Sequence, residues 1–216
     1  MKLFDFIENY KDNIALIGQS GEIITYEKLI LKINDIKKVI PERSLIFLIS
    51  QNSMASIVSY ISAVKNNCVI MLVDIKTNTS DISKLINSYE PSFIIAPRDW
   101  MEKYDQNKFK VLSNINEYYI YKTEFHIPPI LHKDLSVLLP TSGSLGSPKF
   151  VRLSKINLKS NADSIIEYLK IDSSQRSITN MPFNYSYMLS IINTFIETGA
   201  SIYVSKNSIM QKNFWR

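Results

Sequence analysis

Residues 141–149 read Thr-Ser-Gly-Ser-Leu-Gly-Ser-Pro-Lys and directly follow the apolar run Leu-Ser-Val-Leu-Leu-Pro at 135–140. The stretch combines hydroxyl side chains, two of the chain's five glycines and one lysine. Glycines let backbone N–H groups approach an anion closely, hydroxyls donate further hydrogen bonds, and a lysine adds a positive charge. The sequence therefore predicts a buried strand that opens into a phosphate-binding loop.

Two other interpretations of the loop are weaker. A flexible surface loop has a similar Ser/Gly composition, but it does not explain why strand, glycine spacing and lysine coincide. A Walker P-loop requires G-x-x-x-x-G-K-[ST]. In this chain Gly143 and Gly146 are too close together, Pro148 precedes Lys149, and Phe150 stands where a magnesium-binding Ser or Thr belongs.

The loop resembles the phosphate loop of the adenylate-forming superfamily, which includes acyl-CoA synthetases, luciferases and the adenylation domains of peptide synthetases. The family pattern is T-S-G-S-T-G-x-P-K-G-V followed by L-S-H-x-N-L. This chain departs from it at Leu145, which replaces the second threonine, at Phe150, which replaces a glycine, and at Lys155, which replaces the histidine.

Four further segments extend the resemblance over the whole chain. Residues 24–29 resemble the family's early L-T-Y-x-E-L signature, and residues 63–74 resemble K-A-G-A-x-x-x-P-L-D without its glycine and proline. Residues 181–187 resemble the L-P-x-x-H-x-x-G segment that helps to wall the acyl pocket, and residues 199–204 resemble a G-A strand entry.

The resemblance implies an α/β fold of mostly parallel sheets flanked by helices, an incomplete N-terminal domain of an adenylate-forming enzyme. We expect residues 1–216 to form a partial AMP-binding domain. Within it, 1–133 would form a first α/β portion with a connector, and 134–216 the phosphate loop and the start of the acyl-pocket portion. The adenine site, the acidic hinge and the C-terminal lid of the family have no counterpart here.

The resemblance assigns the phosphates of ATP to Thr141, Ser142, Gly143, Ser144, Gly146 and Lys149. The hydroxyls would donate hydrogen bonds, the glycines would permit the loop conformation, and Lys149 would balance phosphate charge. Leu145 removes one hydroxyl, which costs on the order of 1 kcal/mol if that hydroxyl donated a hydrogen bond.

The acyl pocket has one candidate residue, Tyr185, which stands where many relatives carry histidine. An aromatic core residue is an equally good interpretation of Tyr185. Phe183 and Tyr187 are expected in the core, and Asp74 is expected to end a strand without a catalytic role. No residue of this chain is assigned as catalytic or as a metal ligand.

The implied reaction forms an acyl-adenylate and pyrophosphate from ATP and a carboxylic acid, with Mg²⁺ sharing the phosphate charge. A thiol of coenzyme A or of a carrier-protein phosphopantetheine then accepts the acyl group. Because the lid supplies a lysine needed for adenylate formation, we expect this chain alone to be inactive. The alternative is a non-catalytic nucleotide-binding or partner-binding remnant, which the departures at Leu145, Phe150 and Lys155 favour.

The composition is that of a soluble globular protein, with 45% hydrophobic and 21% charged residues. The net charge of +5 is scattered, which argues against nucleic-acid binding.

The single cysteine, Cys68, lies in an apolar run and predicts a buried thiol in a reducing cytoplasm. No run reaches membrane-spanning length, and neither histidine, His126 or His132, has a metal-site pattern around it. Self-association through exposed apolar surface is a further expectation.

The hydrophobic pattern alternates between the two periods of secondary structure. Helical spacing predicts helices over 3–10, 26–40, 53–65, 79–89, 156–170 and 187–197. Short apolar runs predict strands over 44–50, 68–73, 92–96, 111–112, 118–121, 135–140, 150–153, 176–180 and 200–205, and a hairpin over 14–25. Asn52 or Ser53 is expected to cap the third helix, and Thr79 or Ser80 the fourth.

Overall fold

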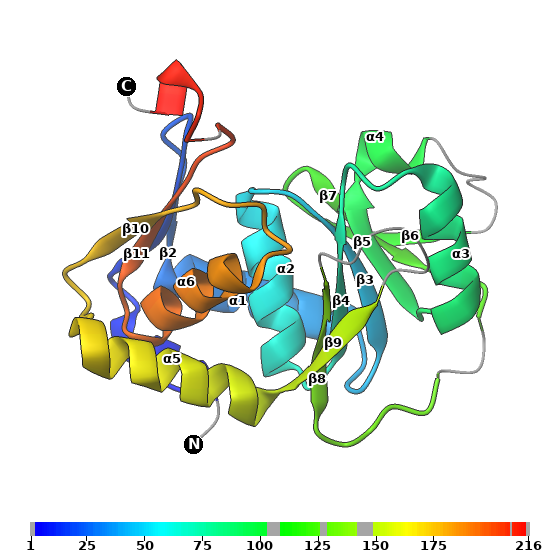
Figure 1. The fold of residues 1–216 in the computed structure, drawn as a ribbon, viewed down its shortest axis with the longest axis horizontal. Helices are drawn as coiled ribbons and strands as arrows, with labels where there is room; N and C mark the ends of the chain where they lie inside the picture. The colour runs from blue at the N-terminus through cyan, green and yellow to red at the C-terminus, as the bar shows by residue number, and fades with distance from the viewer. Residues whose placement is uncertain (1–2, 103–108, 126–128, 142–148, 208, 215–216) are drawn as a thin grey trace.

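The computed structural model describes residues 3–102, 109–125, 129–141, 149–207 and 209–214 (Figure 1). The helices are α1 (Tyr26–Val39), α2 (Met54–Lys65), α3 (Thr79–Tyr89), α4 (Arg98–Met101), α5 (Lys155–Leu169) and α6 (Ser186–Glu197), with 3₁₀ turns η1 (Ile7–Tyr10) and η3 (Lys212–Phe214). The strands are β1 (Ile14–Gly18), β2 (Ile23–Thr25), β3 (Leu45–Ser50), β4 (Val69–Asp74), β5 (Phe93–Pro97), β6 (Lys110–Ile115), β7 (Tyr118–Lys122), β8 (Leu135–Pro140), β9 (Phe150–Ser154), β10 (Arg176–Ile178) and β11 (Ser201–Val204).

The larger of two sheets carries its strands in the order β6-β7-β5-β3-β4-β8-β9. Its central strands β5, β3, β4 and β8 are parallel, while β6, β7 and β9 are added antiparallel at the two ends. The α/β architecture with helices on a largely parallel sheet agrees with the sequence-based prediction.

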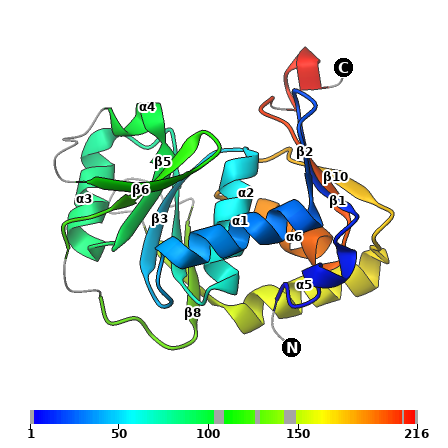
Figure 2. The same ribbon diagram turned by 180° about the vertical axis from the view of Figure 1, so that it is seen from behind.

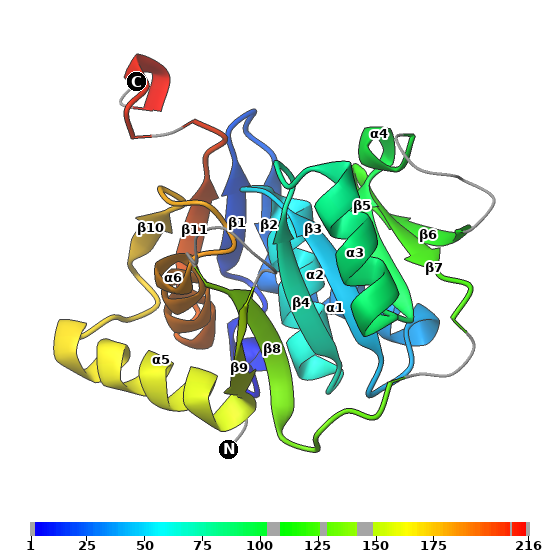
Figure 3. The ribbon, with the colours of Figure 1, turned by 45° about the vertical axis from the view of Figure 1, so that its right-hand side comes forward.

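Both faces of the larger sheet are buried, as parallel strands require. Alternate residues of β3 point to opposite sides: Ile46 and Leu48 join the core beneath α1 and α2, whereas Phe47 and Ile49 join a second core beneath α3. Figure 3 shows α3 in front of this sheet and α1 and α2 behind it. The apolar runs of the sequence are therefore continuous because these strands have no solvent-facing side.

The smaller sheet has the order β10-β11-β1-β2 and joins the two ends of the chain. β1 pairs in parallel with β11, and Leu16 lies opposite Ile202. Helices α1 and α6 lie on one side of this sheet (Figure 2). The buried hydroxyl of Tyr26, at the start of α1, donates to the carbonyl of Ala200 at 2.7 Å and so ties α1 to the entry of β11.

Helix starts follow from short polar side chains that accept a backbone N–H. Ser53 caps α2 by accepting from the N–H of Ser56, as one of the two expected residues. The expected cap of α3 is wrong: Asn78, and neither Thr79 nor Ser80, accepts from the N–H of Asp81. Asn78 has the extended backbone of a cap residue, and the first helical residue of α3 is therefore Thr79.

The expected helix over 3–10 is also shorter than its periodicity indicates, because only Ile7–Tyr10 forms a 3₁₀ turn. Phe4 has a positive φ of 67°, which interrupts a right-handed helix. Its ring is fully buried, its N–H donates to Glu197 Oε2 at 2.6 Å, and its carbonyl accepts from Lys65 Nζ at 2.9 Å. Tertiary contacts thus determine the backbone of this segment.

Glu197 is a buried carboxylate at the end of α6, 6% exposed, with Lys159 Nζ 3.6 Å from its Oε1. Burial raises the pKa of Glu197 above its ordinary value, against the opposing effects of the Phe4 N–H and Lys159. A raised carboxyl pKa in the folded state means that ionisation favours unfolding.

We therefore expect Glu197→Gln to gain stability relative to wild type as pH rises above about 4.3, the unfolded pKa of glutamate. Gln keeps an oxygen acceptor for the Phe4 N–H but has no charge to desolvate. Urea unfolding from pH 3.5 to 7.5 measures the difference. A difference that is constant with pH, or that favours wild type increasingly at neutral pH, contradicts this account.

Cys68 lies directly before β4 and is 1% exposed, as the sequence predicts for a buried thiol. Burial raises its pKa to about 11. Because an unfolded thiol has a pKa near 8.5, alkylation by iodoacetamide at pH 8 should be at least about 200-fold slower in the native protein than in urea. Comparable rates in both conditions would contradict the buried position.

Among the residues that the structure describes, no helix is both long and apolar enough to cross a bilayer.

Candidate functional site

A crevice lies where the connections of two neighbouring parallel strands diverge. β3 continues into α2 on one face of the larger sheet, and the adjacent β4 continues into α3 on the other face. Ligands of open α/β sheets bind at such switch points, outside the carboxyl ends of the strands. Here the two strands end at Ser50 and Asp74.

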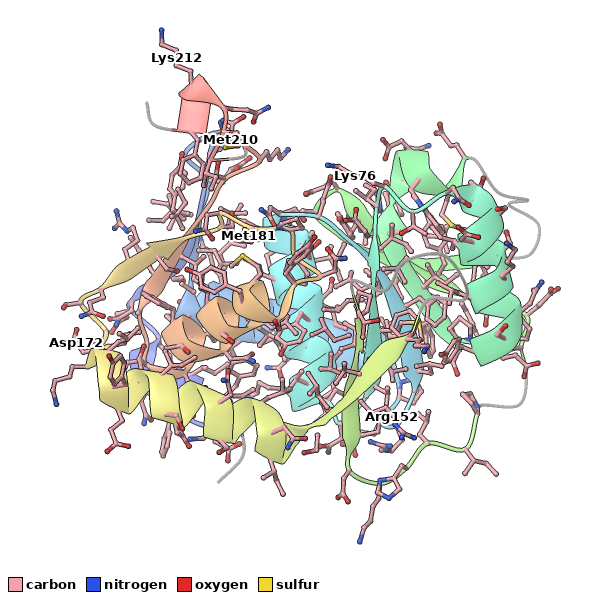
Figure 4. All side chains as sticks on the ribbon, viewed as in Figure 1. Lys76, Arg152, Asp172, Met181, Met210 and Lys212 are labelled. Atoms are coloured by element: carbon pink, nitrogen blue, oxygen red, sulfur yellow. The ribbon has the colours of Figure 1, made fainter. Side chains whose placement is uncertain are left out.

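The crevice has a volume of about 320 Å³ and is bounded by both sheets. Segment 50–52 and segment 74–76 contribute the larger-sheet side, and segments 180–184 and 206–207 contribute the smaller-sheet side after β10 and β11. Figure 4 shows Lys76 and Met181 both in the upper half of the view, on the two sides of the crevice. The carboxyl ends of parallel strands from both sheets therefore converge on one hollow.

Two buried side-chain oxygens in the crevice walls have no hydrogen-bond partner among the described residues. They are Oδ1 of Asn52 and Oδ1 of Asn180. Asn52 Nδ2 donates to the carbonyl of Met181 at 3.0 Å, which joins the two sides of the crevice and fixes the direction of its amide. An unpaired buried acceptor costs about 1–3 kcal/mol, so these oxygens favour a ligand that carries donors.

The predicted phosphate loop leaves the larger sheet one strand away from the crevice, because β8 is the parallel neighbour of β4. β8 and β9 form an antiparallel pair, and the N–H of Thr141 donates to the carbonyl of Lys149 at 2.9 Å. Thr141 Oγ1 donates to the same carbonyl at 3.2 Å. These bonds close the base of the loop and bring two predicted phosphate ligands together.

The Lys149 end of the loop fits an anionic ligand, whereas Thr141 directs both its N–H and its O–H to the Lys149 carbonyl. Thr141 and Lys149 are exposed, and Lys149 has no ion pair in the described part of the chain. The other four predicted ligands, Ser142, Gly143, Ser144 and Gly146, lie outside the described residues, and so does Leu145. Their roles stay predictions.

Arg43 anchors the start of the strand that carries the loop. Its guanidinium donates to the carbonyls of His132 at 2.8 Å, Leu135 at 3.1 Å and Asn67 at 3.2 Å. Charge-assisted bonds to three separate carbonyls hold β8 against the end of α2. Lys155, which replaces the family histidine, donates to Asn67 Oδ1 and so adds to the same junction.

Tyr185 is 48% exposed, which excludes the interpretation as a core residue. It caps α6 through its backbone, and its carbonyl accepts the N–H of Met188 at 3.0 Å. Its ring follows the crevice residue Asn184 in sequence but is not part of the crevice lining. The proposed place of Tyr185 in an acyl pocket stays a prediction.

Phe183 and Tyr187, on either side of Tyr185, were both predicted to be core residues, and only one of them is buried. Phe183 is 1% exposed and packs edge-on against Tyr60, with ring centroids 6.3 Å apart, so its core position is confirmed. Tyr187 is 53% exposed, and the prediction that it is a core residue is wrong. The period of α6 explains the error, because Tyr187 lies on the face opposite Met188 and Leu189, which are buried.

Sequence reasoning missed Asn52 and Asn180 as polar residues of a shared crevice. Asn52 follows the predicted strand 44–50, and Asn180 is the last residue of the predicted strand 176–180, so a position at a strand end was the available signal. Nothing in the sequence indicated that the two strands belong to different sheets whose strand ends border one crevice. Among the described residues no group of three or more His, Cys, Asp or Glu side chains is arranged to hold a metal ion.

The fold defines a class: an α/β protein whose largely parallel sheet carries a crevice at its switch point. Residues 3–216 match the model of the family described as AMP-binding enzyme. The chain therefore belongs to the AMP-binding enzyme family.

Two curated relatives illustrate the range of the family. The chain is 20% identical over 215 residues to a D-alanine–D-alanyl carrier protein ligase of Staphylococcus haemolyticus, covering 96% of this chain and 42% of that protein. It is 23% identical over 216 residues to the equisetin synthetase eqxS of Fusarium heterosporum, covering 92% of this chain and 5% of that protein. The chain thus spans less than half the length of these relatives.

Solved structures share the fold at low identity. Apo MatB of Rhodopseudomonas palustris superposes with a TM-score of 0.76 at 14% identity, over 96% of this chain and 46% of that one. The o-succinylbenzoate coenzyme A synthetase MenE of Bacillus subtilis, solved with ATP and magnesium, gives a TM-score of 0.73 at 14% identity, over 98% of this chain and 60% of that one.

Proposed function

We propose that this chain is the phosphate-binding part of an ATP-dependent ligase that activates a carboxylic acid as its adenylate and passes it to a thiol. The observation that supports this most directly is the closed hairpin base one strand away from the crevice, where Lys149 is exposed and has no ion pair within the described residues. Family membership supports ligase chemistry of this class.

The residues of the chain would act through binding and electrostatics. Lys149 would offset the negative charge of the ATP phosphates, and the loop hydroxyls would donate to phosphate oxygens. When bound, ATP with Mg²⁺ supplies the adenylyl group and the pyrophosphate leaving group. The side-chain oxygens of Asn52 and Asn180, which accept no hydrogen bond from the described residues, would accept hydrogen bonds from a ligand in the crevice.

The thiol acceptor is proposed as coenzyme A or the phosphopantetheine of an acyl carrier protein. Relatives of both kinds exist, since the matching proteins include a D-alanyl carrier protein ligase and a 2-succinylbenzoate–CoA ligase. A cytoplasmic location and the division into portions 1–133 and 134–216 also remain proposals.

We also propose that these 216 residues do not complete the reaction by themselves. The D-alanyl carrier protein ligase is more than twice as long as the region that this chain matches in it. Self-association is a related proposal, supported by the exposed side chains Ile156, Tyr168 and Leu169 along α5.

Carboxylate-dependent exchange of pyrophosphate into ATP tests the proposed function. The assay uses a broad panel of carboxylic acids and compares this chain with a longer polypeptide in which the family fold is complete. Exchange by the longer protein alone supports both proposals. Exchange by the 216 residues alone overturns the second proposal and keeps the first.

A second candidate function is nucleotide or partner binding without catalysis. The replacement of the family histidine by Lys155, whose ammonium is hydrogen-bonded to Asn67, favours it, because this side chain serves a structural junction. Saturable MgATP binding without exchange in either polypeptide would support this second function.

A further inference from the structure

A second cavity, of about 390 Å³, lies at the opposite end of the larger sheet from the phosphate loop. Its lining includes the rings of Phe109, Tyr119 and Tyr121. Side chains alternate along β7, so Tyr119 and Tyr121 share one face, with ring centroids 6.2 Å apart and planes inclined by 35°. Val111 of β6, which lies opposite Tyr121, extends this aromatic floor.

The exposed part of the aromatic floor comes from some of its residues only. Tyr121 is 5% exposed and packs into the core beneath α3 and α4, whereas Phe109 and Tyr119 are half-buried and Val111 is 53% exposed. Cavities of this size lined by aromatic rings, with a few polar groups at the edge, are typical of small-molecule sites. The flat rings favour a planar aromatic ligand, because offset stacking adds to the apolar burial.

Polar groups with unused hydrogen-bonding capacity border the rings. Arg98, the first residue of α4, and Glu102, just beyond its end, both line the cavity. Neither forms an ion pair within the described residues, and the hydroxyls of Tyr119 and Tyr121 have no hydrogen bond there. Burial raises the pKa of Tyr121 to about 12, so its hydroxyl is a donor at neutral pH.

The charges at the cavity edge select among aromatic ligands. A guanidinium offers paired donors that match a carboxylate, and Arg98 supplies one. Glu102 opposes a second negative charge and attracts an ammonium group. A ring with one carboxylate and one ammonium group satisfies both side chains.

We propose that this cavity binds a free aromatic amino acid, with its ring on the half-buried side chains of Phe109 and Tyr119, its carboxylate at Arg98 and its ammonium group at Glu102. The site is separate from the phosphate loop. β7 and β8 are four strand positions apart, which corresponds to about 19 Å. The proposal therefore does not depend on the proposed ligase function.

Calorimetric titration of the 216-residue chain with L-tryptophan tests the proposal, with indole-3-propionate and tryptamine as ligands that lack the ammonium and the carboxylate. Concentrations up to about 10 mM nearly saturate a site with a Kd of about 1 mM. We expect L-tryptophan to bind at least about tenfold more tightly than either analogue, because each loses a charge-assisted contact.

Variants locate the site. Arg98→Gln should weaken L-tryptophan at least about tenfold and leave tryptamine unchanged, and Tyr119→Ala should weaken all three ligands. Arg152→Gln on β9 and Tyr168→Ala on α5, both at exposed positions, are matched controls that should bind as wild type does. Circular dichroism and urea unfolding establish that each variant folds.

Two results overturn the proposal. One is the absence of saturable L-tryptophan binding to the wild-type chain. The other is binding that Arg98→Gln leaves unchanged, and this second result stands even if Tyr119→Ala fails to fold, because Arg98 is exposed and outside both cores.

Discussion

Lys149→Ala should weaken the binding of MgATP by roughly 10- to 150-fold. The reason is the loss of the proposed charge-assisted hydrogen bond from Lys149 to phosphate, which is worth about 1.5–3 kcal/mol. Lys149 is exposed and has no ion pair in the described part of the chain, so its removal breaks no structural contact of that kind. Isothermal titration of the purified chain with MgATP measures the change.

Lys133→Ala is the matched control, since it removes the same charge from the opposite end of β8. The strand spans Leu135–Pro140, which separates the two lysines by about 20 Å. Bulk electrostatic attraction would give both variants a similar, small and salt-dependent loss. Equal losses in the two variants would therefore contradict a direct contact between Lys149 and phosphate. An unchanged affinity in Lys149→Ala would contradict the predicted loop as the MgATP-binding site.

Phe183→Ala should lower the free energy of unfolding by about 3–5 kcal/mol, the range for a large aromatic side chain removed from a packed core. Phe183 is 1% exposed and contacts the ring of Tyr60 on α2, so it packs the segment that borders the crevice against the first core. Urea denaturation with a two-state fit measures the loss.

Tyr187→Ala serves as the comparison within the same segment. Because this ring is 53% exposed, its removal should change the free energy of unfolding by no more than about 0.5 kcal/mol. Similar losses at the two positions would mean that the burial of Phe183 does not anchor the segment. A loss in Tyr187→Ala alone would reverse the assignment of core and surface.

The strands and helices of the larger sheet could be predicted because each has a strong local signal. β3 and β4 are continuous apolar runs, and α1 has helical spacing that stops before Pro41. Local signals failed where distant contacts decide the backbone. Phe4 is held by Glu197 and Lys65, which no pattern near residue 4 reveals.

The strands that flank the predicted loop, β8 and β9, were predictable from sequence, whereas the crevice was not. A nine-residue motif carries the chemistry of a phosphate site, because glycine, hydroxyl and lysine are needed close together in sequence. The crevice depends on Asn52 and Asn180, which are 128 residues apart and meet through the packing of two sheets. Tyr185 shows the same limit, since it directly precedes α6 and no local pattern indicated that its ring would be 48% exposed.

The pairing of β1 with β11 sets the order in which the protein can fold during its synthesis. Leu16 of β1 cannot pair with Ile202 of β11 until the ribosome has added Ile202, 186 residues later. At about 5–20 residues per second this interval is roughly 10–40 s. During that time the β1–β2 hairpin has emerged, but the strand edge that β11 will occupy has no partner. The larger sheet can acquire β3, β4 and β5 in the meantime, so the smaller sheet closes last and is the part of the nascent chain that most needs protection from aggregation.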